Sequence, residues 1–225
     1  MSFRRPDFLI FMKTENIVFD IGNVLMKYDP FAMLEKFSLT AEEKQLFIEK
    51  IFHSPLWLDA DRGCGYRDVL FHKEVQKLPL NLRQVFYALC AKYDFESGNM
   101  PVNEGIEDLL CELKNNGYRL YIISNMGLNF HVFSIKMPLF SYFDGTVVSC
   151  DHSVIKPDRK IFDIFFDKFS LEPASCIFID DTAVNVEASE KAGMPAICYN
   201  ALKQNVCELR ELLAERGVRI EINPG

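Results

Sequence analysis

Over its second half the chain alternates between short apolar runs and amphipathic segments. The apolar runs, rich in β-forming residues, cover residues 118–123, 145–149, 176–179 and 195–199. The segments between and beside them are predicted helices, at 105–116, 157–169, 182–192 and 203–216, and residues 128–137 are helical or loop-like. A buried run from Ile17 to Phe19 is expected to add a strand. Because alternating strands and helices form a parallel sheet covered on both faces, we predict an α/β fold with a doubly wound, Rossmann-like sheet.

The pattern changes between the first strand and the rest of the sheet. Four segments there, at 31–37, 41–52, 66–78 and 82–95, have helical spacing, and none of them reads as a strand. Residues 96–104 contain Gly, Pro and Asn and are typical of a linker. We predict a core of residues 1–28 and 98–225, with an inserted all-helical cap at residues 29–97.

Composition narrows the possible partners. The formal charge is −7 without a basic block, which argues against nucleic acid, and no segment approaches membrane-spanning length. The apolar run near the N-terminus is too short for a secretory signal. The seven cysteines form no CxxC pair, and most, including Cys176 and Cys198, are predicted to be buried small hydrophobes. These observations favour a cytoplasmic protein with a small-molecule partner.

Polar side chains follow the carboxyl ends of several predicted strands, where parallel sheets form their sites. Together with a lysine that precedes a helix, they are Asp20, Ser124, Asn125, Lys156, Asp180 and Asp181. Clustered carboxylates repel one another, and a hard cation such as Mg²⁺ relieves the repulsion. An aspartate in such a site can attack phosphorus and form an aspartyl-phosphate that water later cleaves. Ser124 and Lys156 would hold the transferring oxygens.

Four stretches of sequence strengthen this interpretation. VFDIGNVL at 18–25, YIISN at 121–125, IKP at 155–157 and FIDDTAVNVEAS at 178–189 resemble, in order, the four motifs of the haloacid dehalogenase superfamily. The resemblance covers the chain from about Asn16, and the helical insert is similar to the family's C1 cap.

The resemblance implies a role for each motif residue. Asp20 would be the nucleophile, and Lys156 would be the charge clamp. Ser124 would be the hydroxyl that binds phosphate, with Asn125 beside it. Magnesium would be bound by Asp20, the carbonyl of Gly22 and Asp181, with Asp180 as support.

One position departs from the family pattern. Phosphatases of this family carry DxDx[TV], and here Gly22 stands where the second aspartate protonates the leaving oxygen. Its loss should cost roughly 10²–10⁴-fold in rate. One reading is a substrate whose leaving group needs little protonation, such as a sugar 1-phosphate.

The stretch FDIGNVL is similar to a branch of the family that includes glucose-1-phosphate phosphatase. The cap stretch Asp61–Phe71 resembles that branch's E-R-G-x-I-S segment, so Arg62 is a candidate to face the substrate. An exposed, salt-bridging arginine is the alternative.

Two other readings stay open. A metal-free 2-haloacid dehalogenase needs no proton for its halide, but the paired Asp180 and Asp181 argue against it. A catalytically weak protein of the same fold would bind phosphoesters or a partner with little turnover. Asn185 is predicted to fix loop geometry, Trp57 to belong to the cap core, and the four histidines to bind no metal.

Overall fold

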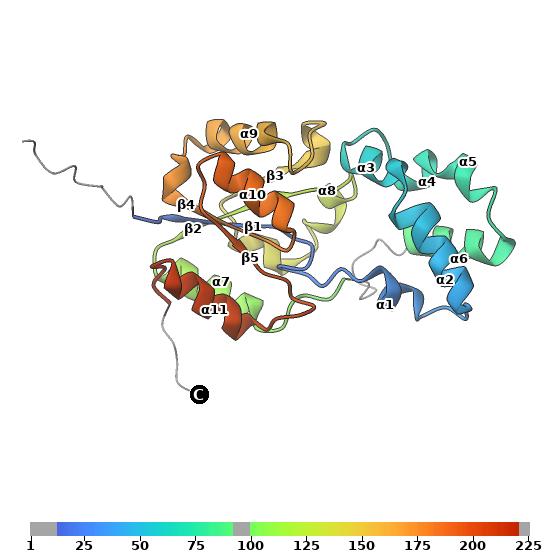
Figure 1. Ribbon diagram of the computed structural model, residues 1–225, viewed down its shortest axis with the longest axis horizontal. Helices are drawn as coiled ribbons and strands as arrows, with labels where there is room; N and C mark the ends of the chain where they lie inside the picture. The colour runs from blue at the N-terminus through green and yellow to red at the C-terminus, as the bar shows by residue number, and fades with distance from the viewer. Residues whose placement is uncertain (1–12, 92–99, 221–225) are drawn as a thin grey trace, which may run out of the picture.

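A five-stranded parallel sheet lies at the centre of the larger part of the molecule (Figure 1). The computed structural model describes residues 13–91 and 100–220. The strand order is β3-β2-β1-β4-β5, so the chain builds outward on one side of β1 and then crosses to the other. This arrangement confirms the predicted doubly wound sheet. The strands are β1 (Asn16–Phe19), β2 (Arg119–Ser124), β3 (Gly145–Val148), β4 (Cys176–Asp180) and β5 (Ala196–Cys198).

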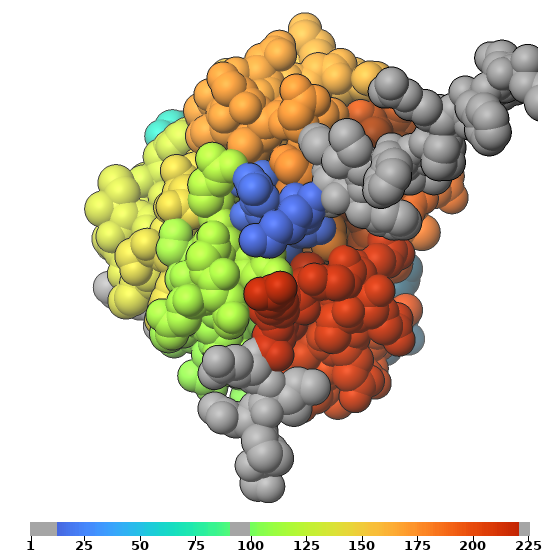
Figure 2. Space-filling model, turned by 90° about the vertical axis from the view of Figure 1, so that its left-hand side faces the viewer, coloured from blue at the N-terminus to red at the C-terminus, as the bar shows by residue number. Residues whose placement is uncertain are grey.

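Helices cover both faces of the sheet, α7 and α11 on one and α9 and α10 on the other (Figure 1). Figure 2 views the end opposite the cap, where the first described residues lie between α7 and α11 below and α9 above. Asn205 caps α11 with both bonds of a capping box, which explains why this helix begins later than the predicted residue 203. The helices are α7 (Ile106–Asn115), α9 (Arg159–Phe169), α10 (Ala183–Lys191) and α11 (Val206–Glu215).

The central strand β1 is buried on both faces. Ile17 and Phe19 pack into the cluster that contains α7, α11 and the cap. Val18 points the other way, into the cluster under α9. A strand with apolar neighbours on both faces reads as a continuous apolar run, which explains the absence of alternation in its sequence.

Between β1 and α7 the described chain is helical. We call these helices the cap; they lie beyond the carboxyl ends of the strands (Figure 1). The predicted helix 41–52 ends in a π-helical turn, and the predicted helix 66–78 divides into two short helices at Phe71. The prediction also missed α3, which Ser54 caps before Pro55 at the first turn. The elements are α1 (Pro30–Leu34), α2 (Ala41–Phe47), η1 (Ile48–Phe52), α3 (Pro55–Asp61), α4 (Arg67–Leu70), α5 (His72–Val75) and α6 (Leu80–Ala91).

The exact limits of the cap stay a prediction. The limit at 97/98 falls within residues 92–99, which lie outside the described residues. Residues 1–12 and 221–225 lie outside them as well. The remaining short elements connect the core strands: α8 (Phe130–Phe133), η3 (Pro138–Tyr142), η4 (Ser149–Asp151) and η5 (Pro173–Ser175).

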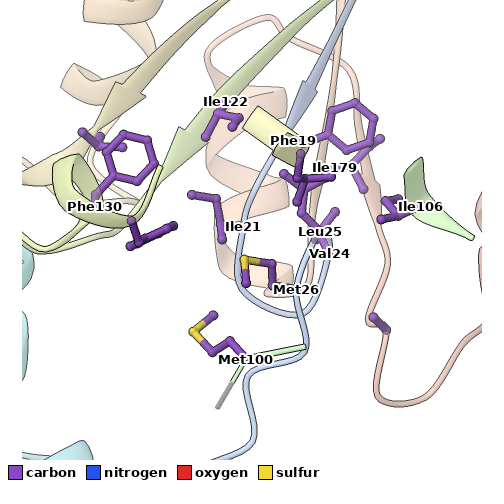
Figure 3. Close-up of a cluster of buried hydrophobic side chains, with 14 of the residues drawn as sticks. Phe19, Ile21, Val24, Leu25, Met26, Met100, Ile106, Ile122, Phe130 and Ile179 are labelled. Carbon is purple, nitrogen blue, oxygen red and sulfur yellow. The ribbon is translucent and has the colours of Figure 1, made fainter. Parts of the chain in front are cut away.

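The loop after β1 is fixed by apolar side chains that point into the core. Ile21, Val24, Leu25 and Met26 are fully buried, and Figure 3 shows them gathered around the end of β1. The loop therefore holds a fixed shape, and the polar residues between these anchors keep fixed positions above the sheet.

The cap is attached to the core in two regions. The outgoing and returning chains pair with each other, because Lys27 N donates to the Pro101 carbonyl at 2.8 Å beside a Met26–Val102 bridge. Elsewhere the turn after α3 touches η4 so closely that a Cβ on Gly63 would lie 2.3 Å from the Cys150 carbonyl oxygen. Gly63 also has a φ of +78°, so this contact requires glycine.

The cysteine prediction is partly wrong. All seven are free, and Cys176 is buried in β4 as expected. Cys198 is exposed, because it ends β5 at the edge of the sheet, and three more are exposed as well. Each helix in the described ranges is too short or too polar to cross a membrane.

Candidate active site

A cavity of about 490 Å³ opens at the carboxyl ends of the strands, between the core and the cap. Its core wall carries most of the predicted site residues and three further asparagines, Asn23, Asn129 and Asn185. Cap residues form the opposite wall, with carbon-rich side chains around a buried ion pair. The predicted residues in the lining are Asp20, Gly22, Ser124, Asn125, Lys156 and Asp181.

Asp20 lies directly after β1 at the floor of the cavity. Its backbone N–H donates to the Ile179 carbonyl at 2.8 Å, which continues the pairing of β1 with β4. Its carboxylate lies 2.9 Å from the Lys156 ammonium, and Ser124 lines the cavity beside it. Burial raises the pKa of Asp20 to about 6, although Lys156 lowers it. The carboxylate is therefore ionised near neutral pH, buried and weakly solvated, as a nucleophile requires.

Lys156 is buried between two carboxylates. Its Nζ forms an ion pair with Asp20 Oδ1 at 2.9 Å, and it donates to Asp180 Oδ2 at 2.6 Å and to the Ile123 carbonyl at 3.1 Å. Burial alone would lower the pKa of Lys156, but the two carboxylates outweigh burial and raise it. The ammonium therefore stays charged at the floor of the cavity.

Asp180 is fully buried and both of its carboxylate oxygens are engaged. Oδ2 accepts from Lys156, while Oδ1 accepts from Thr182 N at 2.8 Å and from Asn185 Nδ2 at 3.0 Å. This residue holds the lysine and the start of α10 in place. Asn185 takes the role in loop geometry that the sequence suggested.

Asp181 comes from the same strand end and lines the cavity. Its Oδ2 accepts from Asn23 Nδ2 at 3.1 Å and from Asn200 Nδ2 at 3.3 Å, and burial raises its pKa. Neither asparagine was among the predicted site residues. Asn23 has a φ of +53°, in the left-handed region that asparagine tolerates. The signal in the sequence was an asparagine directly after Gly22, where a tight turn follows the strand.

The donor set fits a divalent cation. Carboxylate oxygens of Asp20, Asp180 and Asp181 lie within 4.8 Å of one another. Three carboxylates against the single ammonium of Lys156 leave two formal negative charges, which a hard cation with oxygen ligands would neutralise. Since the oxygens of Asp180 are already engaged, Asp20 and Asp181 are the better candidates for direct ligands. The carbonyl of Gly22 stays a predicted ligand.

Two predicted phosphate-binding residues occupy the end of β2. Ser124 is buried beside Asp20 and lines the cavity. The Asn125 side chain bonds to the backbone of Lys156 twice, accepting from its N–H at 2.8 Å and donating to its carbonyl at 3.1 Å. Asn125 therefore positions the lysine loop, and its contact with phosphate stays a prediction.

The structure does not bring Arg62 into the cavity lining. Arg62 caps the end of α3 and pairs with Asp59 at 3.3 Å, with 38% of its side chain exposed. Arg67 lines the cavity instead, buried in an ion pair of 2.7 Å with Asp61. The cap stretch singled out in the sequence does reach the site, but through Asp61 and Arg67. Trp57 also lines the cavity while it packs against Phe52 of the cap core.

A doubly wound sheet with a buried aspartate after its first strand, under a helical cap, defines the class of capped α/β hydrolases. Residues 14–193 match the family model of the haloacid dehalogenase-like hydrolases, and the chain belongs to this family. The resemblance read from the four motifs is thereby confirmed.

Two curated relatives are, by name, a hydrolase and a phosphatase. Flavin mononucleotide hydrolase 1 of Arabidopsis thaliana is 23% identical over 212 residues, which cover 92% of this chain and 79% of that protein. Sesquiterpene phosphatase astK of Aspergillus oryzae is 24% identical over 197 residues, 87% of this chain and 95% of that protein.

Two solved structures share the fold. A predicted hydrolase of this family from Porphyromonas gingivalis superimposes with a TM-score of 0.65 at 22% identity, covering 90% of this chain and 98% of its own. A family enzyme from Bacteroides thetaiotaomicron, solved as a mutant with magnesium and inorganic phosphate, gives a TM-score of 0.65 at 20% identity, covering 87% and 98%.

Proposed function

We propose that this chain is a Mg²⁺-dependent phosphomonoesterase that acts on a small phosphorylated metabolite through an aspartyl-phosphate on Asp20. The observation that carries the proposal is the placement of Asp20, buried in contact with Lys156 and Ser124 and close to Asp181. The family membership and the named activities of the two curated relatives support it.

The reaction follows from the groups at the floor of the cavity. The Asp20 carboxylate attacks phosphorus, the bond from phosphorus to the alcohol oxygen breaks, and water then cleaves the phosphoryl group from Asp20. Lys156 and Ser124 donate to the phosphoryl oxygens as charge develops on them. A Mg²⁺ ion beside Asp20 and Asp181 would supply further neutralisation of that charge.

The sequence and the cavity each suggest a kind of substrate. The sequence favours a sugar 1-phosphate, because Gly22 offers no proton to the leaving oxygen. The carbon-rich lining favours a substrate with an apolar or flat body, and the names of the curated relatives, which specify a flavin mononucleotide and a sesquiterpene, agree with it. The side chains that form this lining are Tyr28, Trp57, Met100, Met126 and Phe133. A substrate panel should include both kinds.

The proposal is tested with an aryl phosphate. We expect Asp20→Asn and removal of magnesium by a chelator each to abolish release of phosphate from p-nitrophenyl phosphate. Asp108→Asn, an exposed aspartate on α7, is the matched control and should retain activity. Full activity of Asp20→Asn, or of the chelated wild type, would refute the proposal.

Two further measurements address the other readings of the sequence. Stabilisation by phosphate without turnover on the whole panel would indicate a binding protein. Chloride release from 2-chloropropionate in the absence of magnesium would indicate a dehalogenase.

A further inference from the structure

The core wall of the cavity lacks a proton donor at the usual place. Apart from Gly22 and its two neighbours in the chain, no described residue has a heavy atom within 4 Å of the position that a Cβ on Gly22 would take, so the space of the missing carboxyl is open. An alkoxide is a poor leaving group, and hydrolysis of an alkyl phosphate therefore needs a positioned acid. Among the residues that the structure describes, the cap brings one buried carboxyl to this cavity, that of Asp61.

Asp61 is fixed to the core through its backbone. It is the last residue of α3, it is 6% exposed, and it lines the same cavity as Asp20. The hydroxyl of Ser149 donates to the Asp61 carbonyl at 2.6 Å and accepts from Met126 N at 2.9 Å. Because Met126 follows the end of β2, these two hydrogen bonds of Ser149 hold Asp61 beside the predicted phosphate-binding end of that strand.

Arg67 orients the Asp61 carboxyl. Its Nη2 donates to Asp61 Oδ1 at 2.7 Å, and its guanidinium lies over the Trp57 ring at 4.1 Å from the ring centroid. On the core side, a Cβ on Gly127 would lie 3.1 Å from Arg67 Nη1, so glycine allows this close approach. The pair is therefore packed between the cap and the loop after β2, and a packed side chain has the fixed orientation that proton transfer requires.

The surroundings of Asp61 favour a proton at neutral pH. Burial raises the pKa of Asp61 to about 7, while Arg67 and Arg62 lower it and Asp20 raises it. A group with such a pKa can donate a proton in one step and accept one in the next. The other titratable groups around it, in the cavity and in the adjoining η4, are Tyr28, His53, Cys150, Asp151, Lys156 and Asp181.

We propose that Asp61 is the general acid and base of this site, in place of the carboxyl that Gly22 lacks. The inference rests on the proposed function. As Asp20 attacks phosphorus and the bond to the alcohol breaks, protonated Asp61 gives its proton to the leaving oxygen. The resulting Asp61 carboxylate then takes a proton from water, whose oxygen attacks phosphorus and releases phosphate and the Asp20 carboxylate. Asp61 ends protonated, and the cycle closes.

Dependence on the leaving group tests the assignment. In Asp61→Asn, which keeps the size of the side chain, we expect kcat/KM for an alkyl phosphate to fall by roughly 10²–10⁴-fold. The loss for p-nitrophenyl phosphate should stay below about tenfold, because nitrophenolate departs without a proton. Asp59→Asn, a half-exposed neighbour on the same helix, is the matched control and should change neither value.

A second variant separates proton transfer from a structural effect. Adding Gly22→Asp to Asp61→Asn places a carboxyl in the open space and should raise the ratio of alkyl to aryl activity at least about tenfold over Asp61→Asn alone. Urea denaturation confirms that each variant is folded.

The outcomes are distinct. Equal losses on both substrates, no loss on the alkyl phosphate, or an unchanged ratio in the double variant would overturn the role of Asp61. A wild type that hydrolyses only the aryl phosphate would overturn it too. A wild type inactive on both substrates would instead refute the proposed function.

Discussion

Replacing Lys156 by methionine should destabilise the metal-free protein in a way that depends on pH. Methionine is similar in length, so the change removes the charge while it leaves little empty space. Asp20 and Asp180 then lose the ammonium that lies 2.9 Å and 2.6 Å from them. Breaking a buried ion pair by removing one partner costs about 3–5 kcal/mol. We expect a loss of that size in the free energy of unfolding at pH 8.

The sign of the pH dependence follows from the pKa of Asp20. This pKa is about 6 in the folded protein and 3.8 ordinarily, so the folded state holds the proton more tightly. The contribution of Asp20 to the stability of the wild type therefore falls as pH rises from 3.8 to about 6, by about 3 kcal/mol. Without Lys156 the folded-state pKa rises further, and the window extends to higher pH. The penalty of Lys156→Met should be at least about 1.4 kcal/mol smaller at pH 5 than at pH 8.

Urea denaturation with a chelator present, at pH 5, 7 and 8, measures these differences. Lys160→Met is the matched control, since this exposed lysine on α9 makes the same change in net charge. Equal penalties for the two variants at pH 8, or a Lys156→Met penalty independent of pH, would contradict the described charge balance.

Three further predictions concern the metal, the cap and the exposed arginine. Mg²⁺ at 100 times its dissociation constant for the wild type should stabilise the wild type by about 2.7 kcal/mol in thermal unfolding. At the same Mg²⁺ concentration, Asp181→Asn should reduce this gain, and the control Asp158→Asn should not. Gly63→Ala should lower the free energy of unfolding by more than about 1 kcal/mol in urea, since its Cβ would meet the Cys150 carbonyl; an unchanged midpoint would mean that the cap does not dock there. Arg62→Gln should leave kcat/KM unchanged in the aryl phosphate assay and alter stability by less than about 1 kcal/mol, and a large loss of activity would return Arg62 to the site.

The core half of the site could be predicted from sequence because parallel strands end at one edge. Once Asp20, Ser124 and Asp181 were placed at strand ends, sheet topology alone brought them together. Lys156 could be predicted because it lies in the loop directly before a predicted helix. The hydrogen bonds of Asp180 were not predictable in detail, because they depend on the turn that begins α10.

The cap half of the site could not be predicted in the same way. Its position depends on tertiary contacts, such as that of Gly63 with η4, which have no periodic signal in sequence. The sequence pointed to a stretch that reaches the cavity, but Arg67 lines it and the predicted Arg62 does not. Since α3 ends at Asp61, Arg62 turns outward to Asp59, while Arg67 on the next helix turns inward.

The two attachments between cap and core have a mechanical consequence. Rotation of the cap about the paired chains at Lys27 and Pro101 would move its wall of the cavity relative to Asp20. The second contact, at Gly63 and Cys150, lies away from the paired chains and restrains this rotation, as does the buried cluster that the cap shares with the core. With both contacts in place, the cap wall keeps a fixed position over Asp20, so a substrate has to fit the space between the cap wall and the core wall. The shape of that space then limits which substrates this chain can bind.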